Sequence, residues 1–313
     1  MTAVLTPTIS PRQGTFFSHE NFIQAVARSQ PEGSVRVLKI CDSNSRAHLF
    51  GLETNIPNYN RRGVSLAPFS LPAYPIDTDD SLACVPSLVA QLKSLRTVWL
   101  YWNVRFDHGD LANQLEACGL SRSEDTTHVL HLNNAYHDLF RGFSETTRNQ
   151  VRQAVRKGVV VRRATNSLEV NTYYSIYRNV IAERPSWGTV YPESLFNELF
   201  KLDDAIILLL AEVKDVVIGG AWFIRDGNSL CYWQGAMDYQ HKKCFPHYAL
   251  MNAAIELACN EGLHSFNMGA SLKMPLLEQF KSFWGTRKVP QWTFAWENPL
   301  WSSISRIRRR ITW

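Results

Sequence analysis

The alternation of apolar and polar positions is most regular in the second half of the chain, where turn residues separate successive strands and helices. Ser144 is a suitable N-cap for a helix, and Gly158 is suited to end it. The pairs Lys214-Asp215 and Asp226-Gly227 interrupt an apolar stretch and predict the two turns of a three-stranded meander. The predicted order is helix 144–157, strand 159–164, helices 169–183 and 192–202, strands 206–214, 216–225 and 229–237, helix 246–259, strand 265–269, helix 276–284 and strand 289–294.

The first half shows a weaker pattern, because prolines and polar turns interrupt it more often. The first 33 residues are predicted to be loosely structured, and residues 54–82, with four prolines and Gly63, to form a long irregular stretch. The remaining alternation favours an α/β (α+β) fold with a mixed sheet covered by helices. Its predicted strands are two within 34–51 and one each at 97–104 and 127–132, and its predicted helices are 86–94 and 109–118.

Length and composition describe a folded protein. The chain has 313 residues, 45% of them hydrophobic, and at roughly 100–200 residues per domain it is long enough for two domains. The six cysteines include no CxxC pair, and His128 and His131 point to opposite faces of a predicted strand, so we expect reduced thiols and no metal site. The N-terminus lacks a signal-peptide pattern and the longest apolar run, Ala205–Ala211, is too short to cross a bilayer, which favours a cytoplasmic protein.

Basic residues are clustered, although the net charge is only +5. Residues 146–168 contain no acid, and Arg148, Arg152 and Arg156 recur every four residues, which places them on one face of the predicted helix. Such a row suits phosphate contacts, so Arg148 and Arg152 are candidate donor-binding residues. Ion pairing with acids elsewhere in the chain stays open as an alternative, and the candidate acids are Glu169, Asp203 and Asp204.

The C-terminal segment 301–313 carries four arginines between apolar residues at helical spacing. A basic amphipathic helix of this kind can lie on a membrane surface, bind RNA or pack its apolar side on the first domain. The sequence leaves these alternatives open, and peripheral contact with the inner face of a membrane is one of them.

Three segments, together spanning about 144–285, resemble one protein family. They are Thr147–Val159, with Arg148-Asn149-Gln150-Val151-Arg152; Gly235–Gly262, with Pro246; and Phe266–Gly285, with Asn267-Met268-Gly269, Phe280-Lys281 and Trp284-Gly285. With the element order, they resemble the GNAT acyltransferase fold and, within it, the Fem-type aminoacyltransferases. The resemblance implies two GNAT-like domains, each a mixed β-sheet flanked by helices: 1–143 plus 293–313 on the acceptor side, and 144–292 on the donor side and catalytic.

The resemblance also implies candidate catalytic residues. Phe280 and Lys281 match a Phe-Lys pair implicated in handling the donor, so Phe280 is expected to stack on an adenine and Lys281 to support developing negative charge or the leaving ribose oxygen. From the residues alone, a core position for Phe280 with Lys281 reaching solvent stays open. Asp238, after the third strand of the meander, is a candidate base for the amine, as are His241 and His247.

The identity of the acyl donor depends on the segment before the long helix. CoA-dependent GNAT enzymes carry a glycine-containing loop whose N–H groups bind pyrophosphate, whereas residues 240–247 contain no glycine and include Pro246. This difference favours aminoacyl-tRNA over acyl-CoA. The remaining candidates are Lys242, Lys243, Gly219 and Gly220 for contact with the donor, and Arg61 and Arg62 for an anionic acceptor.

The sequence therefore predicts an acyltransferase that forms an amide, with aminoacyl-tRNA as donor and a peptide, cell-wall precursor or other small amine as acceptor. Acyl-CoA and acyl carrier protein stay alternative donors, and a non-catalytic RNA- or membrane-binding module is the alternative from another class. No cofactor is expected, because the acyl donor is itself a co-substrate. The sequence contains no fingerprint of serine hydrolases, zinc proteases or nucleotide-binding folds.

Overall fold

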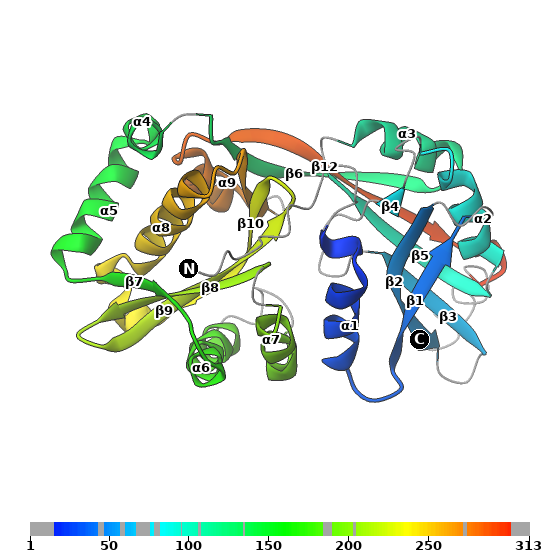
Figure 1. Cartoon of the computed structure of the whole chain (residues 1–313), viewed down its shortest axis with the longest axis horizontal. Coiled ribbons are helices and arrows are strands. Elements are labelled where there is room, and N and C mark those ends of the chain that lie inside the picture. The colour runs from blue at the N-terminus through cyan, green and yellow to red at the C-terminus, as the bar shows by residue number, and fades with distance from the viewer. Residues whose placement is uncertain are drawn as a thin grey trace, which may run out of the picture. The chain divides into compact units, whose positions relative to one another are not determined.

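The chain folds into two compact units (Figure 1). The computed structural model describes residues 16–42, 47–56, 60–66, 76–77, 82–94, 96–105, 108–133, 135–183, 190–202, 205–271 and 274–301. The second unit runs from Thr126 to Val289, and the first unit comprises the described residues before Thr126 and after Val289. The chain passes between the units inside two long strands, β6 (Ser121–His131) and β12 (Arg287–Glu297).

The sheet of the second unit has the strand order β6-β11-β10-β9-β8-β7. Neighbouring strands are antiparallel except β10 and β11, which are parallel. The meander forms because Lys214, Asp215 and Gly227 adopt the positive φ angles that tight hairpin turns require. The strands not yet given are β7 (Val160–Arg163), β8 (Ile206–Val213), β9 (Val216–Asp226), β10 (Ser229–Met237) and β11 (Ser265–Ala270).

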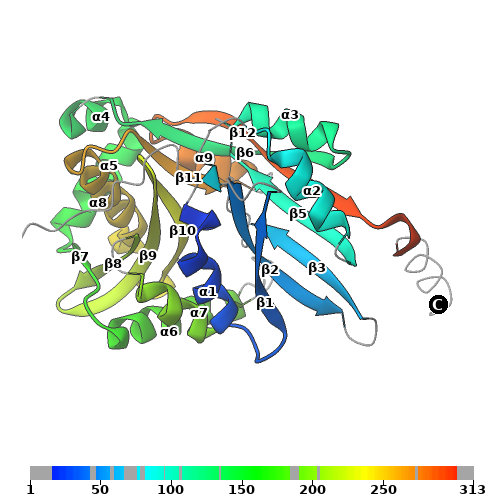
Figure 2. The same ribbon diagram turned by 45° about the vertical axis from the view of Figure 1, so that its right-hand side comes forward.

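Helices cover both faces of this sheet (Figures 1 and 2). One face carries α5 (Glu145–Arg156) and α8 (Pro246–Asn260), and the other carries α6 (Ser167–Glu183) and α7 (Glu193–Phe200). A short helix, α4 (Tyr136–Gly142), packs on α8, and α9 (Pro275–Ser282) follows β11. As predicted, Ser144 caps α5: its hydroxyl oxygen accepts a hydrogen bond from the Thr147 N–H at 3.2 Å.

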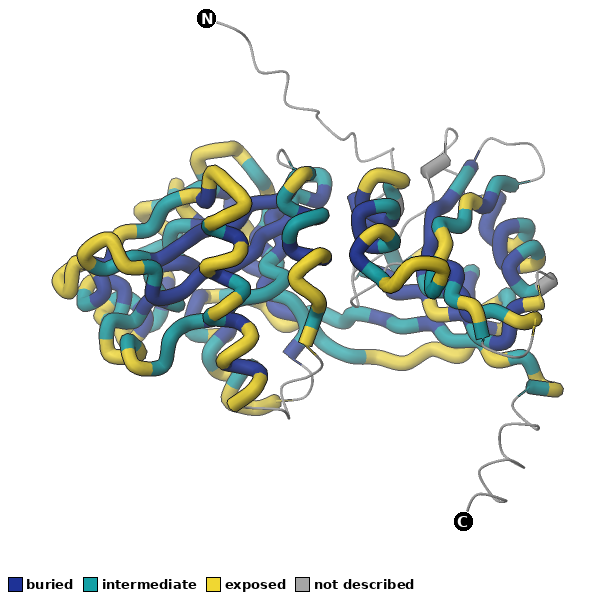
Figure 3. The backbone as a smooth tube through the Cα atoms, turned by 90° about the horizontal axis from the view of Figure 1, so that it is seen from below, coloured by how far each residue is buried: buried dark blue, intermediate teal, exposed yellow. Residues whose placement is uncertain are grey.

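The two faces of the sheet have different cores. The core under α5 and α8 mixes aliphatic side chains with aromatic ones such as Phe223 and Phe266, whereas aromatic rings dominate the space under α6 and α7. There, the Phe196 ring lies 5.8 Å from Tyr173 and 5.5 Å from Trp222. Figure 3 shows the resulting pattern, with buried positions concentrated on the strands and on the helix faces turned toward them.

In the first unit the strands of the sheet have the order β1-β2-β3-β5-β12. Its strands are β1 (Val35–Cys41), β2 (Ala47–Ile56), β3 (Arg61–Leu66), β4 (Ile76–Asp77), which pairs with β2, and β5 (Thr97–Val104). The β3–β5 pair is parallel. After a 3-10 turn at Phe16–Ser18, α1 (Glu20–Arg28) covers one face, while α2 (Val85–Ser94) and α3 (Gly109–Ala117) cover the other, around buried Leu88, Trp102 and Leu111.

The predicted fold class is confirmed, but three elements correct the sequence prediction. The N-terminal region predicted to be loosely structured contains α1, the region predicted to be irregular contains β3, and α4 was not predicted. The predicted catalytic domain began at Ser144, whereas the second unit begins at Thr126. The reason is packing: β6 pairs with β11, and Tyr136 of α4 donates a hydrogen bond to Asn252 of α8 at 2.7 Å.

Some sequence predictions concern residues outside the described part of the chain. These are the basic segment after Trp301 and the acids Asp203 and Asp204. Within the described part, no helix is long and apolar enough to cross a membrane, and no group of three or more His, Cys, Asp or Glu side chains is placed to hold a metal ion. All six cysteines are free thiols.

Gly63 gives a test of the packing in the first unit. A Cβ atom at Gly63 would overlap the ring of Trp99, its neighbour on β5. We expect Gly63→Ala to lower the free energy of unfolding by about 1–3 kcal/mol, which urea titration followed by tryptophan fluorescence would measure. Gly109→Ala, at the start of α3 with nothing within 4 Å of the added atom, is the control. Equal urea midpoints for Gly63→Ala and Gly109→Ala would show that Trp99 moves aside without a loss of stability.

Candidate active site

The strands β10 and β11 pair at one end and then diverge. Their parallel register joins Ser229–Cys231 to Ser265–Asn267 and does not extend further along these two fully described strands. The Asn267 side-chain oxygen accepts hydrogen bonds from the Gly269 N–H at 2.9 Å and from the Thr127 hydroxyl at 2.6 Å. Gly269 also has a φ of +73°, which glycine adopts without steric cost. These local contacts bend β11 and open a wedge in the sheet.

A cavity of about 430 Å³ lies beside the diverging part of β10. The strand bulges there, because its register with β9 shifts between Tyr232 and Gln234, and a bulge re-aims the side chains that follow it. The described residues that line the cavity are apolar, aromatic or uncharged polar. They are Val180, Tyr232, Gly235, Ala236, Met237, Tyr239, His247, Tyr248, Leu277 and Phe280.

Two polar side chains in this cavity are uncharged at neutral pH. Burial raises the pKa of the Tyr232 hydroxyl, which therefore stays protonated. Burial and, secondarily, the Lys281 ammonium lower the pKa of His247 to about 4, so its imidazole is neutral. The two rings are 5.8 Å apart. The cavity thus offers a hydroxyl donor and a neutral imidazole, which are suited to orienting an ester carbonyl and an amine.

Lys281 turns its ammonium into the protein. The residue is only 3% exposed, and Nζ donates hydrogen bonds to the carbonyl oxygens of Gly269 and Ala270, both at 2.7 Å. Both carbonyls belong to the part of β11 that lies beyond its pairing with β10. The structure therefore places this predicted catalytic residue where it holds the diverging end of β11, next to the cavity wall formed by Phe280.

Phe280 lies in the cavity wall, among other aromatic rings. Its ring centroid is 5.5 Å from that of His247 and 5.4 Å from that of Tyr248. Tyr248 in turn stacks on the buried Trp284 at 5.9 Å. The predicted stacking of Phe280 on a donor base stays a prediction, and this position exposes the ring to a ligand of the cavity.

Asp238, the predicted base, follows β10 and begins a 3-10 turn, η5 (Tyr239–Cys244). Its carboxylate accepts a hydrogen bond from the Gln240 N–H at 2.9 Å and is hydrogen-bonded to Nδ1 of His241 at 2.8 Å. Tyr239, rather than Asp238 or His241, lines the cavity. The carboxylate therefore caps the turn and holds His241 at the edge of the site.

The segment that leads into α8 has several of its backbone donors already bonded. The N–H of His241 donates to Asp238, that of Phe245 to Lys242, and those of Tyr248 and Ala249 to Phe245, at 3.0–3.2 Å. Pro246 has no N–H group. Lys242 and Lys243 are exposed and do not line the cavity. An incoming phosphate would find few free N–H groups at this helix start.

The arginine row on α5 packs against α4. Arg148 donates hydrogen bonds to the carbonyl oxygens of Arg141 and Phe143, at 2.6 and 2.5 Å, and the Arg152 guanidinium lies 5.7 Å over the Phe140 ring. The predicted alternative partner of this row, Glu169, instead forms an ion pair with Arg162 at 2.6 Å. Two of the three arginines are thus engaged in packing.

Gly219 and Gly220 lie in the middle of β9, where Gly219 pairs with Met237 and Gly220 with Ala236. A Cβ at Gly220 would come within 2.7 Å of the Tyr173 ring. The protein's own Tyr173 ring thus occupies the space beside Gly220, and contact of these glycines with the donor stays a prediction. In the first unit, Arg62 forms an ion pair with Glu53, whereas Arg61 lines a separate cavity.

The sequence did not single out Tyr232, Tyr248 or Leu277, although all three line the cavity. One weak indication of Tyr232 is present in the sequence: it stands three residues before Gly235, and a glycine within a strand can mark a position where a large neighbouring side chain needs room. A Cβ at Gly235 would lie 2.6 Å from the Tyr232 hydroxyl. The glycine therefore makes room for the tyrosine.

Comparison with known proteins decides the family of the second unit. Residues 141–282 match the family model described as an acetyltransferase (GNAT) domain. The second unit is a GNAT acyltransferase domain. The predicted resemblance is thereby confirmed, and acyl transfer is the chemistry of this family. No curated protein matches the chain in sequence.

Solved structures extend the likeness of fold beyond the GNAT domain. The crystal structure of FemX has a TM-score of 0.73 and 13% identity, covering 95% of this chain and 96% of that one. The C-terminal domain of a protein designated a lysylphosphatidylglycerol synthetase from Agrobacterium fabrum has a TM-score of 0.58 and 11% identity, covering 93% and 91%. A tandem GNAT protein from the clavulanic acid biosynthesis pathway has a TM-score of 0.51 and 11% identity, covering 88% and 87%. At these identities the likeness concerns the fold, which for FemX spans both units.

Proposed function

We propose that this acyltransferase takes an aminoacyl group from aminoacyl-tRNA and transfers it to the amine of a peptide, cell-wall precursor or other small acceptor. Four bonded N–H groups at the start of α8, together with Pro246, support this proposal most directly; they belong to His241, Phe245, Tyr248 and Ala249. A GNAT enzyme that uses acyl-CoA needs free N–H groups there to bind pyrophosphate. An aminoacyl-tRNA donor does not need these N–H groups, because it has no pyrophosphate to be bound there. The Fem-type resemblance favours the same donor.

The cavity supplies the chemistry of the step. The amine attacks the ester carbonyl and a C–N bond forms. The C–O bond to the ribose then breaks, and the proton lost by the amine goes to the ribose oxygen, which leaves as a hydroxyl group. The protonated Tyr232 hydroxyl can donate a hydrogen bond to the ester oxygen as negative charge develops. The neutral imidazole of His247 can accept a hydrogen bond from the attacking amine. Phe280 offers a ring face for the terminal adenine.

A donor comparison tests the proposal. The full chain is incubated separately with charged tRNA and with acyl-CoA, each with a panel of amines, and amine-dependent loss of donor is measured. We expect turnover of aminoacyl-tRNA, abolished by prior RNase treatment, and no turnover of acyl-CoA. Amine-dependent consumption of acyl-CoA alone would overturn the choice of donor.

Two adjacent leucines of α9 provide matched variants for the cavity. Leu277 lines it, whereas Leu276 is 81% exposed. We expect Leu277→Trp to reduce turnover at least tenfold by filling the site, and Leu276→Trp to retain wild-type turnover. Equal rates for both would place the reaction elsewhere.

A further inference from the structure

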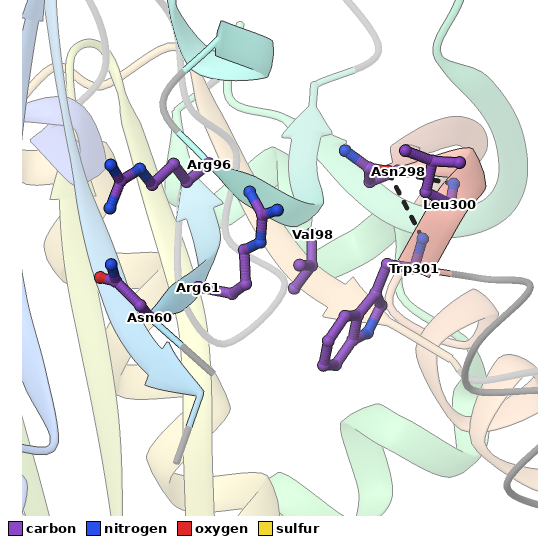
Figure 4. Close-up of a pocket in the computed structure, with 7 residues that line it drawn as sticks. All are labelled: Asn60, Arg61, Arg96, Val98, Asn298, Leu300 and Trp301. Atoms are coloured by element: carbon purple, nitrogen blue, oxygen red, sulfur yellow. Dashed lines mark hydrogen bonds between the residues drawn. The ribbon is translucent and has the colours of Figure 1, made fainter. Parts of the chain in front are cut away.

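The first unit contains a second cavity, of about 520 Å³, at one end of its sheet. Figure 4 shows the side chains arranged around it. They come from the start of β3, the approach to β5 and the segment that follows β12. Its volume lies in the range of about 300–1,000 Å³ typical of small-molecule sites. The lining residues are Asn60, Arg61, Arg96, Val98, Asn298, Leu300 and Trp301.

Two guanidinium groups give this cavity its charge. Arg61 and Arg96 are both exposed, and neither forms an ion pair with an acid of the described residues. The next arginine in the sequence, Arg62, is by contrast paired with Glu53. The described lining residues include no acid. No acid of the described residues thus neutralises the two charges beside this open cavity, and a bound anion would reduce the repulsion between them.

Asn298 adds fixed hydrogen-bond donors. Its side-chain oxygen accepts hydrogen bonds from the N–H groups of Leu300 at 3.1 Å and Trp301 at 3.4 Å (Figure 4). Because the oxygen has these two donors, the orientation of the amide is set and its NH₂ group remains available for another acceptor. Arg61, Arg96 and Asn298 therefore present donors only.

We propose that this cavity binds the phosphate group of a small soluble molecule. A phosphate monoester carries a charge of about −1.5 to −2 at pH 7 and three acceptor oxygens, which match two guanidinium forks and an amide. One carboxylate has a single charge and two oxygens, which one arginine fork satisfies. Val98, Leu300 and the Trp301 ring form an apolar side of the cavity, which suits the organic part of the ligand.

Calorimetric titration of the full chain with phenyl phosphate tests this proposal, with inorganic phosphate and phenol as companion probes. We expect phenyl phosphate to bind with a dissociation constant below about 1 mM, more tightly than inorganic phosphate, and phenol not to bind. Arg61→Gln and Arg96→Gln are each expected to weaken binding about tenfold or more, since each removes a charge-assisted hydrogen bond.

The matched control is Arg36→Gln, which removes an exposed arginine of β1 outside the cavity and is expected to leave the affinity unchanged. Wild-type affinity in both cavity variants would overturn the proposal, as would binding of phosphatidic acid vesicles without binding of phenyl phosphate. All the described lining residues belong to the first unit, so the outcome is independent of the acyl donor used by the GNAT domain.

Discussion

Lys281→Met is expected to lower the free energy of unfolding by about 2–4 kcal/mol, because it leaves two inward-facing carbonyl groups without their donor. Methionine keeps an unbranched apolar chain of similar length, so the loss of the hydrogen bonds to Gly269 and Ala270 dominates the effect. Urea titration measures this loss. The control is Lys288→Met, which removes a half-exposed lysine paired with Glu278 and is expected to cost at most about 1 kcal/mol.

The same substitution is expected to change the candidate active site. The Lys281 charge contributes to the lowered pKa of His247, so its removal should raise the pKa of that imidazole, measurable by NMR titration. Amine-dependent turnover at a temperature where the variant stays folded should fall by at least tenfold, because the end of β11 is no longer held. A variant that is destabilised yet keeps both the His247 pKa and the turnover would limit Lys281 to a role in stability.

The sequence predicted the order of elements in the GNAT domain because local chemistry determines it. The Ser144 cap and the turns at Lys214-Asp215 and Gly227 act within a few residues, and the structure confirms each of them. The missed elements depend on distant partners. β3 lies beside β5 and contains Gly63 in a proline-rich region, and the nine-residue helix α1 is held by packing against β1 and β2.

The site was less predictable than the fold, for the same reason. The family resemblance identified Phe280 and Lys281 as candidates. Their adjacency in sequence could not show that Phe280 lines the cavity while Lys281 is buried. The cavity itself depends on where β10 and β11 separate, which Asn267 determines through its contacts with Thr127 and Gly269. The first of those contacts spans 140 positions of the chain, beyond the reach of any local pattern.

His247 provides a second large effect, through the pH dependence of stability. Its folded-state pKa is lowered to about 4, against an ordinary value of 6.5. Between these values the unfolded chain binds a proton that the folded chain does not, so stability is fully present above pH 6.5 and decreases as the pH falls toward 4. Because the side chain is partly exposed, we expect a contribution of roughly 2 kcal/mol over this window.

His247→Gln should therefore flatten the decline in stability between pH 7 and pH 4.5, as measured by urea titrations at a series of pH values. His128, whose pKa is also lowered by burial, remains in the variant and maintains part of the slope with the same sign. His131→Gln, which removes an exposed imidazole of β6, is the matched control. An unchanged slope in His247→Gln would mean that the imidazole is hydrated in the folded protein. The cavity would then be more open to water than its aromatic lining implies, and a charged imidazolium would face the cavity at mildly acidic pH.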